Sequence, residues 1–195
     1  MRILLRSSFL LTLASLLASC TTVATSGASA LYNHQSIEKS VNDEYITMRS
    51  YQAIDIDSDH FKNANINVST FNRMVLLSGQ APTAEQKMAA EELVRKIGGI
   101  DQVYNWITVE KPASQIARAN DVWLTAKIKA KMLASSDLDS SQVKVVTENR
   151  RVFLMGILRP QAAKAAVNVA STTSGVEQVV KIFSYLNLSK TPLES

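Results

Sequence analysis

The sequence is short of the residues that build disulfide or metal frameworks, with one cysteine and two histidines in 195 residues. A single cysteine excludes an intramolecular disulfide framework and a cysteine-rich zinc site. His34 and His60 are too few for a histidine-built metal site. Glycine (6) and proline (4) are scarce as well, whereas 46% of the residues are apolar and 19% are charged. That mixture is typical of a globular protein and too apolar for a disordered one.

Patterns that carry catalysis are also missing. The chain has no glycine-rich phosphate loop, no nucleophile elbow and no metal-ligand spacing. His60 follows Asp57 and Asp59, which we interpret as a solvated polar turn, and Glu91-Glu92 are neighbours on a predicted helix, where adjacent side chains point apart. We therefore expect no enzyme, no catalytic residue, no metal and no cofactor. A modest charge without an aromatic and basic sheet surface also argues against nucleic-acid binding.

Long apolar runs are absent apart from Phe9–Leu17, which is far shorter than the ~20 residues that span a bilayer. Arg2 and Arg6 precede this run, and together they predict a cleaved signal peptide over residues 1–19. No other segment approaches a membrane-spanning length, so we expect no transmembrane helix.

The end of the signal, Leu17-Ala18-Ser19-Cys20, resembles a bacterial lipobox. The resemblance implies that Cys20 carries covalent diacylglycerol and an N-linked acyl chain such as palmitate, and two or more chains give stable anchoring. Thr21 stands where an inner-membrane lipoprotein carries aspartate, which favours the periplasmic face of a Gram-negative outer membrane. The alternative is an ordinary signal peptide with an unmodified cysteine. Residues 20–35 are rich in Ser, Thr and Ala and predict a flexible tether spanning roughly 20 Å.

The remainder of the chain consists of two copies of one sequence unit. Four blocks recur in the same order at offsets of 76 to 78 residues, which indicates a tandem duplication. We place a first repeat at residues 36–111, a second at 115–187 and a tail at 188–195. The matching blocks are 43–47 with 121–125, 66–68 with 143–145, 75–79 with 152–156, and 99–103 with 175–179.

The sequence pattern of each repeat predicts the element order αββαβ. In the first we expect helices over Ile37–Ala53 and Thr83–Ile97 and strands over Asn65–Phe71, Met74–Ser78 and Val103–Val109. In the second we expect helices over Gln115–Ala134 and Pro160–Thr173 and strands over Gln142–Thr147, Arg151–Met155 and Gln178–Tyr185.

Short turn signals join these elements. Asn72-Arg73 and Asn149-Arg150 predict two-residue hairpin turns, because asparagine tolerates positive φ. Gly98-Gly99 and Gly175 are expected to cap the second helix of each repeat. The fold class is α+β, with a three-stranded mixed sheet packed on two helices in each repeat. One sheet face would be covered and the other partly open, and small cores favour two repeats that lean on each other.

This unit, with its Leu-x-Gly strand end and its Gly-[Ile/Val]-x-x-Val entry to the last strand, resembles the BON domain. Two such units behind a lipobox resemble the dual-BON outer-membrane lipoproteins, over residues 36–187. The resemblance implies a non-catalytic protein that binds anionic, phosphatidylglycerol-like phospholipid and supports envelope integrity. It further implies that the opening helix of the second repeat is the lipid contact.

Charge is distributed unevenly between the repeats. The chain carries a net +4, which falls to +2 once Arg2 and Arg6 leave with the signal peptide. Residues 20–111 contain 8 Lys/Arg against 11 Asp/Glu, whereas residues 112–195 contain 11 against 6. Core packing does not require opposite charges of −3 and +5, so we expect the repeats to have different partners.

A stripe on the opening helix of the second repeat is our candidate phospholipid site. Trp123, Lys127 and Lys131 recur every four residues, with the apolar Leu124 beside them. The alternative is that Trp123 seals the helix against its sheet. In the first repeat the corresponding residues, Tyr45, Arg49 and Ala53, are weaker in size and charge. Trp106 aligns with Ile182, and we expect it to pack in the core or between the repeats.

Two functions follow. The first is a membrane-binding lipoprotein, as above. The second is a scaffold whose open sheet faces or acidic first repeat dock envelope assembly or division proteins. The oligomeric state is left open by the sequence.

Overall fold

The computed structural model describes residues 42–55 and 57–185. The signal peptide, Cys20, the tether and the tail 188–195 therefore lie outside the described residues. Within the described ranges, no helix combines the length and the apolarity that crossing a membrane requires.

Both repeats follow the predicted order of elements. The first repeat contains a helix over residues 42–55, β1 (Asn65–Phe71), β2 (Met74–Ala81), α3 (Ala84–Arg95), β3 (Gln102–Asn105) and β4 (Thr108–Val109). The second contains α4 (Gln115–Leu133), a short 3₁₀ turn η2 (Ser140–Gln142), β5 (Val143–Glu148), β6 (Arg151–Leu158), α5 (Pro160–Ser171) and β7 (Gln178–Tyr185).

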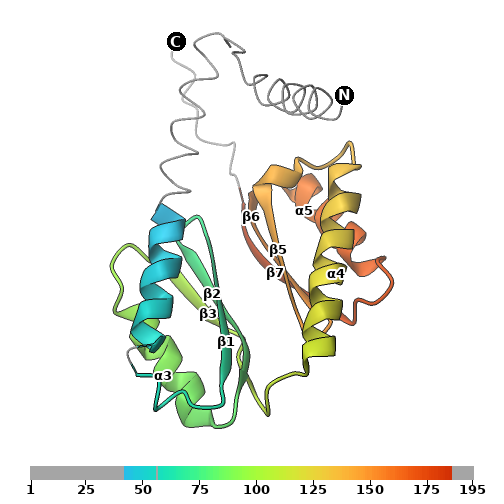
Figure 1. Cartoon of the computed structure of the whole chain (residues 1–195). Helices are drawn as coiled ribbons and strands as arrows, with labels where there is room; N and C mark the ends of the chain where they lie inside the picture. The colour runs from blue at the N-terminus through green and yellow to red at the C-terminus, as the bar shows by residue number, and fades with distance from the viewer. Residues whose placement is uncertain (1–41, 56, 186–195) are drawn as a thin grey trace, which may run out of the picture. The chain divides into compact units, whose positions relative to one another are not determined.

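Each repeat builds one mixed sheet with its helices on one face (Figure 1). In the first, β2 pairs with β1 antiparallel and with β3 and β4 parallel. In the second, β6 pairs with β5 antiparallel and with β7 parallel. The α+β class and the mixed sheet on two helices are thus confirmed.

The hairpin turns form as predicted. Asn72 and Arg73 have φ of 49° and 65°, and Asn149 and Arg150 have φ of 48° and 60°. Two successive positive values are the geometry of a type I′ turn, which matches the twist of the flanking strands.

A carboxylate from the opening helix holds each of these turns. The two oxygens of Asp121 accept the backbone N–H groups of Asn149 (2.7 Å) and Arg150 (2.9 Å). Asp43 accepts the N–H groups of Asn72 and Arg73 in the same way. The sequence aligned these two aspartates in the repeat but did not reveal their role. They fix the helix against the hairpin.

The Leu-x-Gly pattern has a steric cause. Gly79 has a φ of 101°, and a Cβ there would lie 2.0 Å from the carbonyl oxygen of Asn65 on β1. At Gly156 an added Cβ would lie 2.8 Å from the carbonyl oxygen of Gln142. A side chain at either position would force the hairpin strands apart.

The last strand of the first repeat and the glycine caps differ from the prediction. The last strand of the first repeat is broken after Asn105, because the Asn105 Oδ1 accepts the N–H of Ile107 (3.2 Å) and so competes with the strand ladder. The predicted glycine caps are displaced, since α3 is capped by Lys96 and α5 by Thr172, both without positive φ. Gly99 and Gly175 lie three residues further on, in the turn into the last strand.

The central strands are buried on both faces. On β2, Val75 and Leu77 face the helices of the first repeat, whereas Met74 and Leu76 join a second cluster. That cluster contains residues of both repeats: Met74, Leu76, Phe153, Met155 and Ile182. The expectation of a partly open sheet face is therefore wrong for these strands, and the two repeats do lean on each other.

Trp106 belongs to this contact between the repeats, as predicted. Its ring meets Phe153 edge-on with 5.6 Å between centroids, and the guanidinium of Arg151 lies 5.7 Å from the Trp106 ring. Such aromatic pairs contribute roughly 0.5–1.5 kcal/mol beyond the burial of their area.

Polar groups flank the apolar contact. Glu148 accepts hydrogen bonds from Gln80 Nε2 (2.7 Å) and Asn67 Nδ2 (3.0 Å) across the repeats. Lys144 Nζ donates to the carbonyl oxygen of Thr70 (2.8 Å). Burial raises the pKa of Glu148 above its ordinary value of 4.5, and it lowers the pKa of Lys144. The contact thus carries specific hydrogen bonds as well as apolar area.

Replacement of the turn-holding carboxylate should destabilise the fold. Asp121→Ala removes two charge-assisted hydrogen bonds from a residue that is 5% exposed, so we expect a loss of about 2 kcal/mol in the free energy of unfolding. Urea denaturation measures this. Asp137→Ala, at an exposed position, is the matched control and should change stability by less than about 0.5 kcal/mol.

Glu148 should make stability depend on pH. Its pKa is raised on folding, so its contribution to stability is fully present below pH 4.5 and is lost as the pH rises through the folded-state pKa. Glu148→Gln abolishes this titration. We expect the stability of wild type relative to Glu148→Gln to fall as the pH rises above about 4.5 in urea titrations. A constant difference would contradict the assignment.

Candidate functional site

The second repeat presents a helix whose ends are well defined. Ser114 caps the start of α4, its side chain accepting the N–H of Ala117 (3.2 Å), and the helix ends at Leu133. Leu124, Ile128 and Met132 recur every four residues and are buried in the core of this repeat. The opposite side of α4 faces solvent.

That exposed side carries large apolar residues flanked by lysines. We call it the outer face of α4, and we define it by these residues: Ile116, Val122, Trp123, Lys127, Lys129, Lys131 and Leu133. The exposed fractions are 77% for Ile116, 71% for Val122, 61% for Trp123 and 77% for Leu133.

Helical spacing orders these residues into rows. Ile116 and Trp123 are seven residues apart and form the central row. Lys127 and Lys131 follow Trp123 at intervals of four on one side, while Lys129 lies with Val122 and Leu133 on the other. An apolar ridge between two basic flanks results.

Trp123 and Lys127 are in direct contact. The Lys127 Nζ lies 4.7 Å from the centroid of the Trp123 ring and also donates to the carbonyl oxygen of Ser174 (3.3 Å). The lysine therefore restrains the ring on the surface. The structure supports an exposed Trp123, and the alternative that it seals the helix against the sheet is wrong.

A shallow depression of about 330 Å³ lies beside Trp123. Asn120, Asn149, Arg150 and Gly175 contribute to its wall. The guanidinium of Arg150 is already engaged, by the Gly175 carbonyl oxygen (3.1 Å) and by Glu177 (2.5 Å). The depression therefore offers polar groups next to the ring but no free cation of its own.

Comparisons with known proteins agree with this architecture. The BON domain family matches residues 42–111 and 120–187. The chain is 35% identical to the outer membrane lipoprotein DolP of Haemophilus influenzae over 147 residues, covering 75% of this chain and 76% of that protein. The chain belongs to the BON-domain family.

Other relatives carry different names. A 21 kDa hemolysin of Actinobacillus pleuropneumoniae is 38% identical and covers 75% of each chain. The osmotically-inducible protein Y of Escherichia coli is 32% identical over 71% of this chain and 70% of its own. Among solved structures, CdsD of the Chlamydia trachomatis type III secretion system aligns at 12% identity with a TM-score of 0.30. The alignment covers 71% of this chain and 91% of that chain, and the likeness is too distant to indicate a function.

One predicted site residue needs correction. Leu124 is 3% exposed and packs in the core of the second BON domain, so it is not part of the outer face of α4. It lies next to Trp123 in sequence but about 100° around the helix. Lys131 is exposed, as the predicted site requires, and Cys20 lies outside the described residues.

Three apolar residues of the outer face escaped the sequence prediction. Ile116, Val122 and Leu133 do not share the four-residue spacing from Trp123 that predicts the stripe. Their positions opposite the Leu124–Ile128–Met132 row are the signal that identifies them. Elsewhere, within the described ranges, no cluster of three His, Cys, Asp or Glu side chains is placed to hold a metal ion.

Fluorescence should distinguish the two tryptophans of the chain. In Trp106→Phe the remaining Trp123, which is 61% exposed, should emit at long wavelength and be quenched strongly by acrylamide. In Trp123→Phe the remaining Trp106, packed on Phe153, should emit at shorter wavelength and be quenched less. Equal quenching of the two variants would contradict an exposed Trp123.

Proposed function

We propose that this chain is an envelope lipoprotein, anchored through Cys20, whose second BON domain binds anionic phospholipid through the outer face of α4. The observation that carries the proposal is the row of exposed apolar side chains flanked by lysines on that face. The role is in envelope integrity, without turnover of a substrate.

The apolar ridge fits the interfacial zone of a bilayer. Four large apolar side chains on one helical face form the kind of exposed patch that marks an interaction surface. Tryptophan favours the membrane interface because its ring is amphipathic, and Ile116 lies two helical turns away on the same row. The helix can then lie in the plane of the interface with this ridge inserted.

The lysines supply selectivity for anionic headgroups. Lys127, Lys129 and Lys131 form no ion pair with a carboxylate in the described part of the chain. Each such cation near an anionic surface contributes about 1 kcal/mol, so three favour anionic over neutral membranes by on the order of 100-fold. Their stems can lie along the apolar ridge while the amines reach phosphates.

The first BON domain is a poorer candidate. Its opening helix also exposes Tyr45 (52%), Met48 (49%) and Tyr51 (43%), but Asp43 and Glu44 stand near the start of the described helix. The Tyr51 hydroxyl is held by the N–H of Val68 (3.0 Å). Lipid binding therefore falls to the second domain.

Localisation to the outer membrane is supported by the name of the Haemophilus influenzae relative and by Thr21 after the lipobox. A Cys20 anchor with two or more acyl chains holds the chain on the membrane without help from α4. The α4 contact would then orient the folded part and select anionic lipid around it.

Vesicle flotation of non-acylated residues 21–195 tests the proposal. We expect binding to phosphatidylglycerol vesicles but not to phosphatidylcholine vesicles, weakening as salt rises because surface charges are screened. Trp123→Glu should reduce binding by at least about tenfold, since it places a carboxylate in the ridge.

Met88→Glu is the matched control, because Met88 is an apolar residue on α3 that is 64% exposed. It should bind like wild type. Equal binding to both lipids, or an unchanged Trp123→Glu variant, would overturn the proposal.

A further inference from the structure

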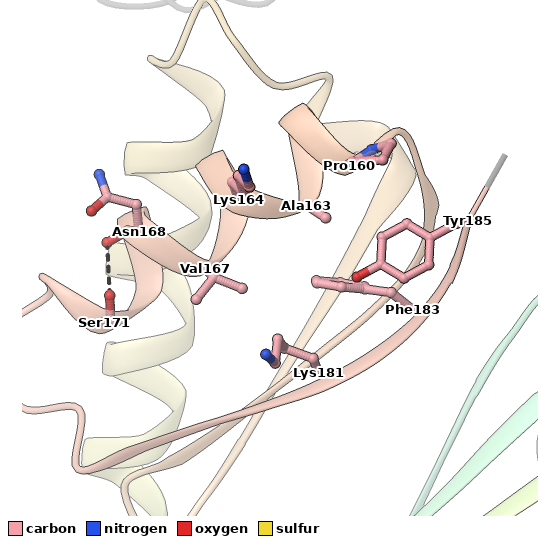
Figure 2. A pocket seen from close by; sticks show the side chains of 9 residues that line it. All are labelled: Pro160, Ala163, Lys164, Val167, Asn168, Ser171, Lys181, Phe183 and Tyr185. Atoms are coloured by element: carbon pink, nitrogen blue, oxygen red, sulfur yellow. Dashed lines mark hydrogen bonds between the residues drawn. The ribbon is translucent and has the colours of Figure 1, made fainter. Parts of the chain in front are cut away.

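A groove of about 730 Å³ lies between α5 and the edge strand β7, on other elements than the outer face of α4 (Figure 2). Val167 and Lys164 come from α5, and Lys181, Phe183 and Tyr185 come from β7. The three β7 residues are two apart, so they share the face of the strand that looks toward the helix. The groove is thus apolar with a lysine on each wall.

The strand that forms one wall has a free edge. β7 runs for eight residues and pairs with β6 alone among the described strands. Alternate residues of such a strand direct their N–H and C=O groups outward, where they can pair with another chain. Natural edge strands are commonly shortened or broken to prevent this, and β7 is neither.

In the first repeat, the corresponding gap between α3 and the edge strand is closed. There the edge strand is split into β3 and β4, and Ile107 turns into the core with 1% exposure. The Asn105 Nδ2 bridges to α3 through the Lys87 carbonyl oxygen (2.9 Å) and Glu91 Oε2 (3.0 Å).

In the second repeat both bridging partners are replaced. The strand register puts Lys181 at the place of Asn105. Helices α3 and α5 begin and end 76 residues apart, which puts Val167 at the place of Glu91 and Ala163 at the place of Lys87. The strand–helix bridge is lost and one carboxylate is gone, so the groove is open and basic. Neither Lys164 nor Lys181 has an ion-pair partner in the part of the chain that the structure describes.

We propose that this groove binds an extended acidic peptide segment of a partner protein, which adds to β7 as a further strand. The backbone of the peptide would pair with the free edge, and its alternate side chains would enter the groove beside Val167 and Phe183. Carboxylates of the peptide would meet Lys164 and Lys181. An extended strand fits better than an acyl chain because β7 presents backbone groups and side chains at a period of two, and a hydrocarbon uses neither.

An NMR titration of the isotope-labelled chain, residues 21–195, tests this. The probe is a capped hexapeptide, Glu-Ser-Val-Ser-Glu-Ser, whose glutamates and valine fall on one face of a strand. The control probe replaces each glutamate with lysine. We expect the acidic peptide to shift the amide signals of β7 and α5 but not those of α4. The basic peptide should leave β7 unchanged.

Charge reversal supplies the second arm. Lys164→Glu with Lys181→Glu should weaken the acidic peptide by about tenfold or more. Lys87→Glu, which changes a lysine on α3 beside the closed gap of the first repeat, should bind like wild type, and both variants should keep the dispersed spectrum of a folded chain.

Several results would overturn the proposal. Peptide shifts confined to α4, equal affinity for the basic peptide, or full affinity in the double variant would each do so. Binding of the double variant to phosphatidylglycerol vesicles is the last measurement.

If the double variant loses vesicle binding while no peptide shifts the amide signals of β7, the groove is a lipid site instead. Retained vesicle binding by the double variant with lost peptide binding supports two separate sites.

Discussion

Each sheet of this protein has two apolar faces and helices for only one of them, and the remainder of the structure depends on that constraint. On β2 and β6, successive residues alternate between the helix side and the other repeat, and both sets are buried. One repeat thus supplies the missing layer of the other. Because the central strands are buried in this contact, their faces are not available to dock envelope proteins, and of the two docking surfaces in the scaffold hypothesis only the acidic first repeat remains. The surfaces left for function are the outer sides of the helices and the sheet edges.

A second, local constraint makes the duplicated unit a precise frame for those surfaces. Asp43 and Asp121 tie the opening helix of each repeat to its type I′ hairpin turn, and a hydroxyl pair repeats beside them, Thr47 with Thr70 (2.8 Å) and Thr125 with Thr147 (2.7 Å). A helix held at two points along its inner side cannot rotate about its axis. The outer face of α4 is therefore fixed in its exposure, which is the condition for a defined membrane contact.

Much of this fold could be predicted from the sequence, because strand alternation, Asn-Arg turns and the repeat itself are local patterns. β1 and β7 begin and end at the predicted residues. The predictions from the sequence were wrong where the role of a side chain depends on contacts with residues far away in the chain. The split after Asn105 depends on an amide that bonds to α3, and the burial of the open sheet faces depends on the partner repeat. At the candidate site, the stripe of Trp123, Lys127 and Lys131 follows from spacing, but the assignment of Leu124 to it required knowing which side of α4 meets the core.

The divergence of the two repeats is the most informative feature that remains. Two duplicated units with the same core are subject to the same packing requirements. Core packing therefore does not explain why the first repeat closes the gap between helix and strand with Asn105 while the second leaves it open around Lys181. The same holds for the opposite net charges of the two halves. Both changes fall on the second repeat, yet on different elements: α4 packs mainly over β5, whereas the groove lies between α5 and β7. Because α5 stands between the two surfaces, a bound bilayer and a bound peptide need not compete. Under the two proposals, the second repeat carries both binding surfaces, and the first repeat contributes mainly the contact that buries the shared sheet faces.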